Sequence, residues 1–423
     1  MNASNYVAKR YSRWLAVWDG RHRPRLQSPS GLLNALKWGT RRPMLALLTV
    51  GGYTLTLCTA AYALIALVSR ARTYRPGVHA RSVSASARQP VTVLKPLCGD
   101  EPRLEENLVT FCEQTYPEYQ LLFGVRDPVD PAIAVVERLK ARYPQRDIEL
   151  VVDSRVHGSN LKVSNLINIE SSARHPWLVL ADSDIAVAPD YLERVSAPLA
   201  DPVVGIVTCL YHGRPLDTFW TRMGALFIDT WFAPSVRVAS AFGRDCFGFG
   251  ATIAMRADTL AGIGGFAAVR NRLADDYWLG QLSRDLGLAT VLSDVWVTTD
   301  VTERTFGSMW ARERRWMKTI CRLNPLGYAF TFVTFTFPMV GLGLLLAPTR
   351  WNLVLALMGG VARLALHQRA PADRLPAPGN ARYAPLRDSL LFLTWLSAFV
   401  GSTARWREQT VQIQDDLVGP ISQ

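Results

Sequence analysis

Trp177-Leu178-Val179-Leu180-Ala181-Asp182-Ser183-Asp184 is an apolar run that ends in two carboxylates one residue apart. The apolar part is typical of a buried strand, so the sequence predicts Asp182 and Asp184 at the carboxyl edge of a sheet, where open α/β sheets bind ligands. Two carboxylates there suit a hard divalent cation that holds a diphosphate. Asp-x-Asp is also common in loops by chance, so the motif needs support from the rest of the chain.

The region around this motif alternates between strand-like and helix-like patterns. Strands are expected over residues 91–94, 119–125, 148–152, 177–181 and 203–210, and helices over 104–112, 132–143 and 161–172. Such alternation predicts an α/β domain with a mostly parallel sheet and helices on both faces. No G-x-G-x-x-G follows the first expected strand and no Walker-type lysine is found, which disfavours dinucleotide-binding and P-loop proteins.

The positive charge of the chain is concentrated at its N-terminal end. The net charge is +12, and residues 1–90 carry fourteen Lys or Arg against a single acid, Asp19. This basicity flanks one apolar segment, where anionic lipid headgroups attract it, so no nucleic-acid partner is expected. The six cysteines show no paired spacing, which favours reduced thiols in a cytosol-facing domain.

Long apolar segments at both ends predict a multi-pass membrane protein. Residues 43–69 are uncharged and long enough to cross a bilayer. Residues 327–347 form a second plausible span that Pro338 would kink. Residues 351–366, interrupted by Arg363, and residues 389–400 could each span, re-enter or lie at the interface. Five Lys/Arg precede the first span within twenty residues and five follow it, so the positive-inside rule gives no orientation.

These patterns divide the chain into six parts. They are a basic N-terminal segment (1–42, in which 31–38 suggests a short interfacial helix), a transmembrane helix (43–69), a linker (70–89), the α/β domain (90–325), C-terminal transmembrane or re-entrant helices (326–404) and a tail (405–423).

Further charged residues fall at or near the ends of expected elements. Asp127 follows the second strand, and Asp275-Asp276 lie in a polar turn before an apolar helix start. Arg312 and Arg315 are three residues apart, hence on one helical face, and Trp316 follows them. Each has an ordinary structural alternative: a helix N-terminus favours acids, and a basic helix end near a membrane is common.

Taken in order, the motifs resemble those of family 2-like inverting glycosyltransferases of GT-A fold. More closely, they resemble the ceramide glucosyltransferase family and its bacterial hopanoid-associated glycosyltransferase relatives. The resembling motifs are Lys95-Pro96-Leu97, Arg126-Asp127, Gly158-x-Asn160-x-Lys162-x-x-Asn165-Leu166, Asp182-Ser183-Asp184, Gly248-x-Gly250, Asp275-Asp276-Tyr277 and Arg312-x-x-Arg315-Trp316. They cover roughly residues 90–325 and leave out residues 1–42.

The chain departs from the family pattern at two points. It has Asp-Ser-Asp where animal ceramide enzymes have Asp-Ser-Gly, so its metal site looks more like that of the wider family. The signature often written Gln-x-x-Arg-Trp begins here with Arg312, which suits non-processive lipid glycosylation better than polymer synthesis.

The resemblance implies a role for each site residue. Asp276 would be the catalytic base, and Asp184 with Asp182 would hold Mg²⁺ or Mn²⁺ on the diphosphate of the sugar donor. The other residues that would contact the donor or line its pocket are Lys95, Asp127, Lys162, Asp182, Arg312, Arg315 and Trp316. For Lys162 the alternative is an exposed helix lysine.

The implied function is transfer of glucose or N-acetylglucosamine from a UDP-sugar to a hydroxyl of a membrane lipid, either a hopanoid polyol or a ceramide-like lipid. Nucleotide sugars are cytosolic, so the catalytic domain is expected on the cytoplasmic side of a membrane, the inner or cell membrane in a bacterium. A processive polysaccharide synthase, a polyprenyl-phosphate sugar transferase and an inactive membrane scaffold remain alternatives.

Overall fold

The computed structural model describes residues 29–69, 73, 88–244, 248–368 and 380–401, and the strand segments 403–406, 409–414 and 417–419; side chains are described from Met44 to Gly401 within these ranges. The chain divides into two compact units, Met1–Gly51 and Gly52–Gln423. The fold below is that of the second unit. Residues 1–28 of the expected N-terminal segment (1–42) and most of the expected linker (70–89) lie outside the described residues.

A large sheet forms the centre of the α/β domain. Its strands are β1 (Val91–Pro96), β2 (Tyr119–Val125), β3 (Asp147–Val152), β4 (Trp177–Leu180), β5 (Ile185–Ala186), β6 (Val204–Pro215), β7 (Ile253–Arg256) and β8 (Ala289–Val301). The helical segments of the domain are α3 (Leu104–Cys112), α4 (Ala132–Arg142), α5 (Leu161–Glu170), α6 (Tyr191–Ser196), η3 (Ala197–Ala200), α7 (Phe219–Phe227), the π-helix η4 (Ile228–Phe232), α8 (Ala233–Ala241), α9 (Ala257–Gly262), η5 (Phe266–Val269), α10 (Asp275–Asp285) and α11 (Phe306–Leu323).

The strand order is β3-β2-β1-β4-β7-β6-β8-β5. Strands β3, β2, β1 and β4 are parallel, with Val91 paired to both Tyr119 and Trp177. Strand β7 lies antiparallel between β4 and β6, and β5 pairs antiparallel with β8. The sheet is therefore mixed and less parallel than expected. The reason is that the chain leaves β6, passes through α7, η4 and α8, and comes back as β7 directly beside β6. Without a crossover connection, β7 runs in the opposite direction to β6.

Alternate residues of the buried strands face two separate apolar cores. Val93, Phe123 and Val179 belong to one core, whereas Leu94, Leu122 and their neighbours pack with helix α5 in the other. All residues of β1, β2 and β4 are buried. Because both faces are covered, the polar ligand-binding groups of these strands can only lie at their ends.

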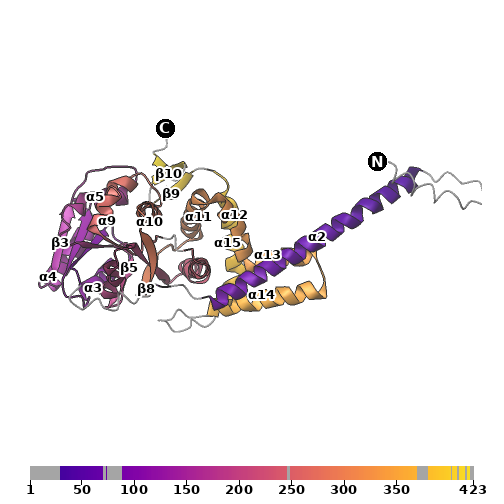
Figure 1. Cartoon of the computed structure of the whole chain (residues 1–423), viewed down its shortest axis with the longest axis horizontal. Coiled ribbons are helices and arrows are strands. Elements are labelled where there is room, and N and C mark those ends of the chain that lie inside the picture. The colour runs from indigo at the N-terminus through magenta and orange to yellow at the C-terminus, as the bar shows by residue number, and fades with distance from the viewer. Residues whose placement is uncertain are drawn as a thin grey trace, which may run out of the picture. The chain divides into compact units, whose positions relative to one another are not determined.

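The segments outside the α/β domain are mainly helical. They are α2 (Pro29–Val68), α12 (Pro325–Phe330), η6 (Thr331–Thr334), α13 (Thr336–Leu346), α14 (Arg350–Gln368), η7 (Asn380–Tyr383) and α15 (Ala384–Ala398), followed by a small antiparallel sheet of β9 (Thr403–Trp406), β10 (Gln409–Gln414) and β11 (Leu417–Gly419). Nothing in the tail sequence had predicted this sheet. Helices α13 and α14 run side by side (Figure 1).

Small residues bring the second half of α2 close to these helices. A Cβ added to Gly52 would lie 2.7 Å from the carbonyl oxygen of Gly343, and one added to Gly359 would lie 3.0 Å from Ala60. Close approach through small residues is the usual way in which helices pack in lipid. The second half of α2 thus packs closely against α13 and α14 in this structure.

The apolar segments differ in detail from those expected. Within the described residues, Met44–Val68 is the one helix long and apolar enough to cross a membrane by itself, and Pro325–Thr334 with Thr336–Leu346 forms a pair bent by 77°. The bend comes before Pro338, which lies in the first turn of α13, where its missing N–H breaks no helical bond. Arg363 does not interrupt α14.

Candidate active site

Asp182 and Asp184 lie just beyond the carboxyl end of β4, as the sequence predicted. The ammonium of Lys95 donates to the backbone carbonyl of Asp182 at 2.6 Å and lies 3.8 Å from the centre of the Phe111 ring. Burial lowers the pKa of Lys95 to about 7, against the charges of Asp184 and Asp182, which raise it. In this structure Lys95 supports the Asp182 loop, and its contact with a nucleotide stays a prediction.

Asp184 is held from strand β8. Thr299 donates its hydroxyl to the carboxylate of Asp184 at 2.7 Å, and the N–H of Asp300 donates to the backbone carbonyl of Asp184 at 3.1 Å. Burial, together with the neighbouring charges of Asp182 and Glu101, raises the pKa of Asp184 to about 7. Asp184 therefore lies in a pocket of excess negative charge.

Lys162 lies inside this cluster and is not an exposed helix lysine. Asn160 caps helix α5 by accepting a hydrogen bond from the N–H of Val163, which fixes the turn that carries Lys162. The Lys162 ammonium lies 2.6 Å from a carboxylate oxygen of Asp182 and 3.4 Å from one of Asp275. Burial alone would lower the pKa of Lys162, but the charges of Asp182 and Asp275 raise it above the usual lysine value.

Asp275 and Asp276 form the first turn of helix α10, so the expected polar turn is already helical. The carboxylate of Asp276 accepts hydrogen bonds from the N–H groups of Gly250 and Tyr277, both at 2.8 Å. Burial and the charge of Asp275 raise the pKa of Asp276 to about 7, although Lys162 lowers it. A carboxylate with such a pKa suits proton transfer near neutral pH.

Gly250 connects the two acidic loops. Its carbonyl accepts from the N–H of Asp182 at 3.3 Å while its own N–H binds Asp276. A Cβ at Gly250 would lie 2.8 Å from a carboxylate oxygen of Asp182, and one at Gly248 would lie 2.2 Å from the carbonyl of Asp276. Backbone approach this close explains why both positions are glycine.

Helix α11 carries the Arg312, Arg315 and Trp316 motif. Thr305 and Ser308 form a capping box at its start. One nitrogen of the Arg312 guanidinium lies 2.9 Å from Glu303, while the Nε and Nη2 atoms are buried and have no hydrogen-bond partner among the described residues. Two donors remain for an anion such as a phosphate. The roles of Arg312 and Arg315 in binding the diphosphate stay predictions.

Trp316 belongs to an aromatic cluster next to the acids. Its ring lies 6.5 Å from that of Tyr211 and 5.4 Å from that of Phe227, and Phe232 and Phe249 complete the cluster. Burial raises the pKa of Tyr211 well above its usual value, and the charges of Asp276, Asp182 and Asp184 add to this. The aromatic cluster therefore lies within electrostatic reach of all three carboxylates.

Asp127 is exposed after strand β2, where its carboxylate accepts from the N–H of Val129 at 3.0 Å. Its contact with a nucleotide also stays a prediction. Sequence reasoning missed Thr299, Glu101 and Tyr211. Thr299 could not be found, because it meets Asp184 only through the pairing of β5 with β8.

The donor set fits a hard divalent cation in part. Asp182 and Asp184 offer carboxylate oxygens of the kind that Mg²⁺ and Mn²⁺ prefer, and their crowded charge favours a cation. No group of three or more His, Cys, Asp or Glu able to hold a metal occurs within the described ranges. Two protein carboxylates would therefore need further oxygen ligands from a phosphate or from water.

An α/β sheet with partly buried acids at its carboxyl edge, next to an arginine-bearing helix and an aromatic cluster, fits the GT-A type of fold. A solved structure supports this fold: mannosyltransferase PcManGT from Pyrobaculum calidifontis, in complex with GDP-Man and Mn2+, gives a TM-score of 0.51 at 19% identity, covering 84% of this chain and 98% of that chain. The model of glycosyl transferase family 21 matches residues 51–417, and this chain belongs to that family.

Curated relatives are ceramide glucosyltransferases. Ceramide glucosyltransferase 3 of Caenorhabditis elegans is 26% identical over 311 residues, which is 72% of this chain and 66% of the relative. The ceramide glucosyltransferase of Komagataella phaffii is 29% identical over 138 residues, 32% of this chain and 26% of the relative. The matched regions thus span two thirds or less of these relatives' lengths. The predicted family resemblance and enzyme class are confirmed.

Proposed function

We propose that this chain is a membrane-bound inverting glycosyltransferase that moves glucose or N-acetylglucosamine from a UDP-sugar to a hydroxyl of a lipid acceptor, a ceramide-like lipid or a hopanoid polyol. The observation that carries the proposal is the bridge at Gly250. It brings Asp276 next to Asp182, so the proposed base and the proposed diphosphate-binding edge would share one site. The names of the curated relatives support a lipid acceptor.

Inverting transfer is a single in-line displacement at the anomeric carbon of the sugar. Asp276 would take the proton from the attacking hydroxyl, because its carboxylate is oriented by two N–H groups and its raised pKa favours proton uptake. The unpartnered nitrogens of Arg312, with Arg315, would donate hydrogen bonds to the leaving diphosphate. Lys162 would balance the charge of Asp182 and Asp275 when no donor is bound.

Asp184 and Asp182 are the residues that would hold Mg²⁺ or Mn²⁺, which would supply Lewis-acid stabilisation of the departing nucleoside diphosphate. The aromatic cluster around Trp316 would provide an apolar wall for the sugar and the acceptor. Asp127 and Lys95 remain the proposed contacts at the nucleotide side of the sheet edge.

The membrane arrangement is part of the proposal. Residues 43–69 would span the bilayer, residues 70–89 would link this span to the catalytic domain of residues 90–325, and residues 326–404 would span or re-enter. Exposed apolar side chains on α14 support lipid contact, among them Trp351, Leu357 and Val361. Cytosolic nucleotide sugars would place the catalytic domain on the cytoplasmic side.

The test is transfer by the purified protein in lipid vesicles. The vesicles contain either ceramide or a hopanoid polyol, the donors are UDP-glucose and UDP-N-acetylglucosamine, and mass spectrometry identifies products. The proposal expects a neutral glycolipid with inverted anomeric configuration. A polymer, a phosphate-linked sugar or no product with any donor and acceptor would each contradict it.

A further inference from the structure

Two arginines are buried outside the catalytic cluster, Arg363 on α14 and Arg387 on α15. Each pairs with a buried acid: a guanidinium nitrogen of Arg363 lies 2.5 Å from Asp388, and Arg387 donates to Glu313. Removing two charges from water is costly, and apolar residues can often replace such a pair without loss of stability. A contribution to folding stability is therefore a poor explanation for the presence of these two buried ion pairs.

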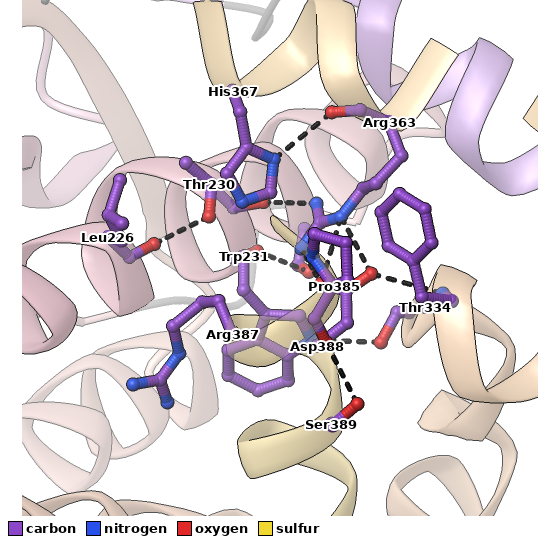
Figure 2. Close-up of polar contacts among 12 residues, drawn as sticks. Leu226, Thr230, Trp231, Thr334, Arg363, His367, Pro385, Arg387, Asp388 and Ser389 are labelled. Atoms are coloured by element: carbon purple, nitrogen blue, oxygen red, sulfur yellow. Dashed lines mark hydrogen bonds and ion pairs between the residues drawn. The ribbon is translucent and has the colours of Figure 1, made fainter. Parts of the chain in front are cut away.

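Asp388 connects three elements. Besides Arg363 on α14, its carboxylate accepts from the N–H of Phe337 at 3.3 Å, in the first turn of α13 directly after the 77° bend. Arg363 in turn donates to the carbonyl of Thr230 in the π-helix η4 at 2.5 Å. Figure 2 shows Arg363 and Asp388 pointing toward one another beside Thr230.

Arg387, the preceding residue, extends the network to the catalytic helix. It donates to Glu313 on α11 and to the carbonyl of Met223 on α7 at 3.2 Å. Glu313 directly follows Arg312, and burial raises its pKa while the guanidiniums of Arg387 and Arg312 lower it. One residue pair on α15 thus connects α11 to α13 and α14.

Both arginines also bind the backbone of residues 223–230, the segment whose Phe227 side chain contacts Trp316. The carbonyls of Met223 and Thr230 lie on either side of Phe227 in the chain, and the Phe227 ring contacts Trp316. A shift of this segment or of α11 would move Trp316 and Arg312 relative to the acids. Misplacement of about 1 Å can cost on the order of 100-fold in rate.

We propose that Arg387 and Asp388 are positioning residues that hold helix α11, and with it Arg312 and Trp316, in register with the α13 and α14 helices of the C-terminal apolar segment. This inference rests on the proposed glycosyl transfer. Neither residue touches the reacting groups. They act through Glu313, Arg363 and the backbone of α7 and η4.

The test uses the Arg387–Glu313 pair in the full-length protein. Arg387→Met leaves Glu313 buried without its partner, so a lower Tm is expected. The double variant Arg387→Met/Glu313→Gln removes both charges, so its Tm returns toward that of the unsubstituted protein. If the pair positions α11, the kcat of the double variant remains on the order of 10-fold to 100-fold below that of the unsubstituted protein, while its KM for UDP-sugar changes little. Recovery of both Tm and kcat would overturn the inference.

Arg382→Met is the matched control, because Arg382 is exposed five residues before Arg387; its kcat should stay unchanged. Hydrogen exchange without substrate separates this inference from the proposed function. Faster exchange of the amides of residues 306–323 in the double variant, with unchanged exchange in β1–β4, supports positioning even if the unsubstituted protein transfers no sugar. Unchanged exchange over 306–323 contradicts it in either case.

Discussion

Asp276 is the residue on which the proposed chemistry depends most directly. Its carboxylate is partly buried, held by the N–H groups of Gly250 and Tyr277, and near the ammonium of Lys162. This fixed geometry costs no reorganisation during the reaction. Asp184, the proposed ligand of the cation on the leaving-group side, is anchored by Thr299.

Asp276→Asn should abolish transfer, with a loss on the order of 100-fold to 10,000-fold, since an amide cannot accept the proton. The amide oxygen can still accept from the N–H of Gly250, so donor binding should persist. A radiolabelled-sugar assay measures transfer and calorimetry measures UDP-sugar binding. Asp285→Asn, an exposed position at the end of the same helix, is the control. Near-normal turnover by Asp276→Asn would remove this residue as the base.

The rate should depend on pH through the same carboxylate. Because burial raises the pKa of Asp276 to about 7, the base is protonated and inactive below this pH and ionised above it. We therefore expect kcat/KM for transfer to rise with unit slope as pH increases toward about 7 and to level off above it. A pH–rate profile that is flat through this region would contradict the assignment.

Asp184→Ala should weaken binding of the donor in the presence of Mn²⁺. The variant removes one of two carboxylates at the edge of the sheet, and with it the excess negative charge that favours a cation. Calorimetric titration of UDP-sugar with and without Mn²⁺ measures the effect. Asp258→Ala, an exposed carboxylate outside the site, should bind the donor normally. Unchanged affinity in Asp184→Ala would rule out the metal assignment.

At the scale of elements, two loops and the start of a helix converge, because strands β4 and β7 are neighbours in the sheet and Gly250 binds the first turn of α10. The loop after β4 carries Asp182 and Asp184, the segment before β7 carries Gly250, and helix α10 begins with Asp275 and Asp276. Gly250 is where these elements touch. Because these elements fit so closely, position 250 has no room for a side chain and the site requires glycine.

Gly250→Ala should lower kcat/KM by about 10-fold or more, because the new Cβ would lie 2.8 Å from Asp182 and 3.2 Å from Lys162. Steady-state kinetics with the lipid acceptor measure the loss. Gly307→Ala is the matched control, since a Cβ at Gly307 would meet nothing within 4 Å. If Gly250→Ala retains full activity, the two acidic loops are not held together as closely as the structure indicates.

At the scale of the whole molecule, the candidate site and the C-terminal apolar helices belong to one compact unit, residues 52–423. Helix α11 leads directly into α12, and α15 packs against α11 through Arg387 and Glu313. A site built on such helices would work near the bilayer surface. The acceptor would then arrive by diffusion within the membrane.

The rate of transfer should accordingly depend on the surface concentration of the acceptor in the membrane. At a fixed bulk concentration of acceptor, adding inert phospholipid should lower the rate, because the acceptor's mole fraction in the membrane falls. Initial rates in vesicles of constant acceptor and increasing carrier lipid provide the measurement. A rate that depends only on bulk acceptor would contradict encounter within the bilayer.

The sequence by itself determined many of the local elements and named the candidate residues of the site. The helix over residues 104–112 and the strand over 119–125 agree with the structure, because periodicity and breakers are local properties. The ordered motifs led to the family, whose model matches residues 51–417. The sequence also placed Asp182 and Asp184 at the end of a strand, where they are found.

Only the tertiary structure decided how these residues act together. The antiparallel insertion of β7, the hold of Thr299 on Asp184 and the bridge at Gly250 depend on pairing between segments far apart in the chain. The same is true of Arg363, which interrupts an apolar pattern in the sequence but is neutralised by Asp388 of another helix. Local patterns report which face of an element is buried. They do not report which distant charge or backbone group that face will meet.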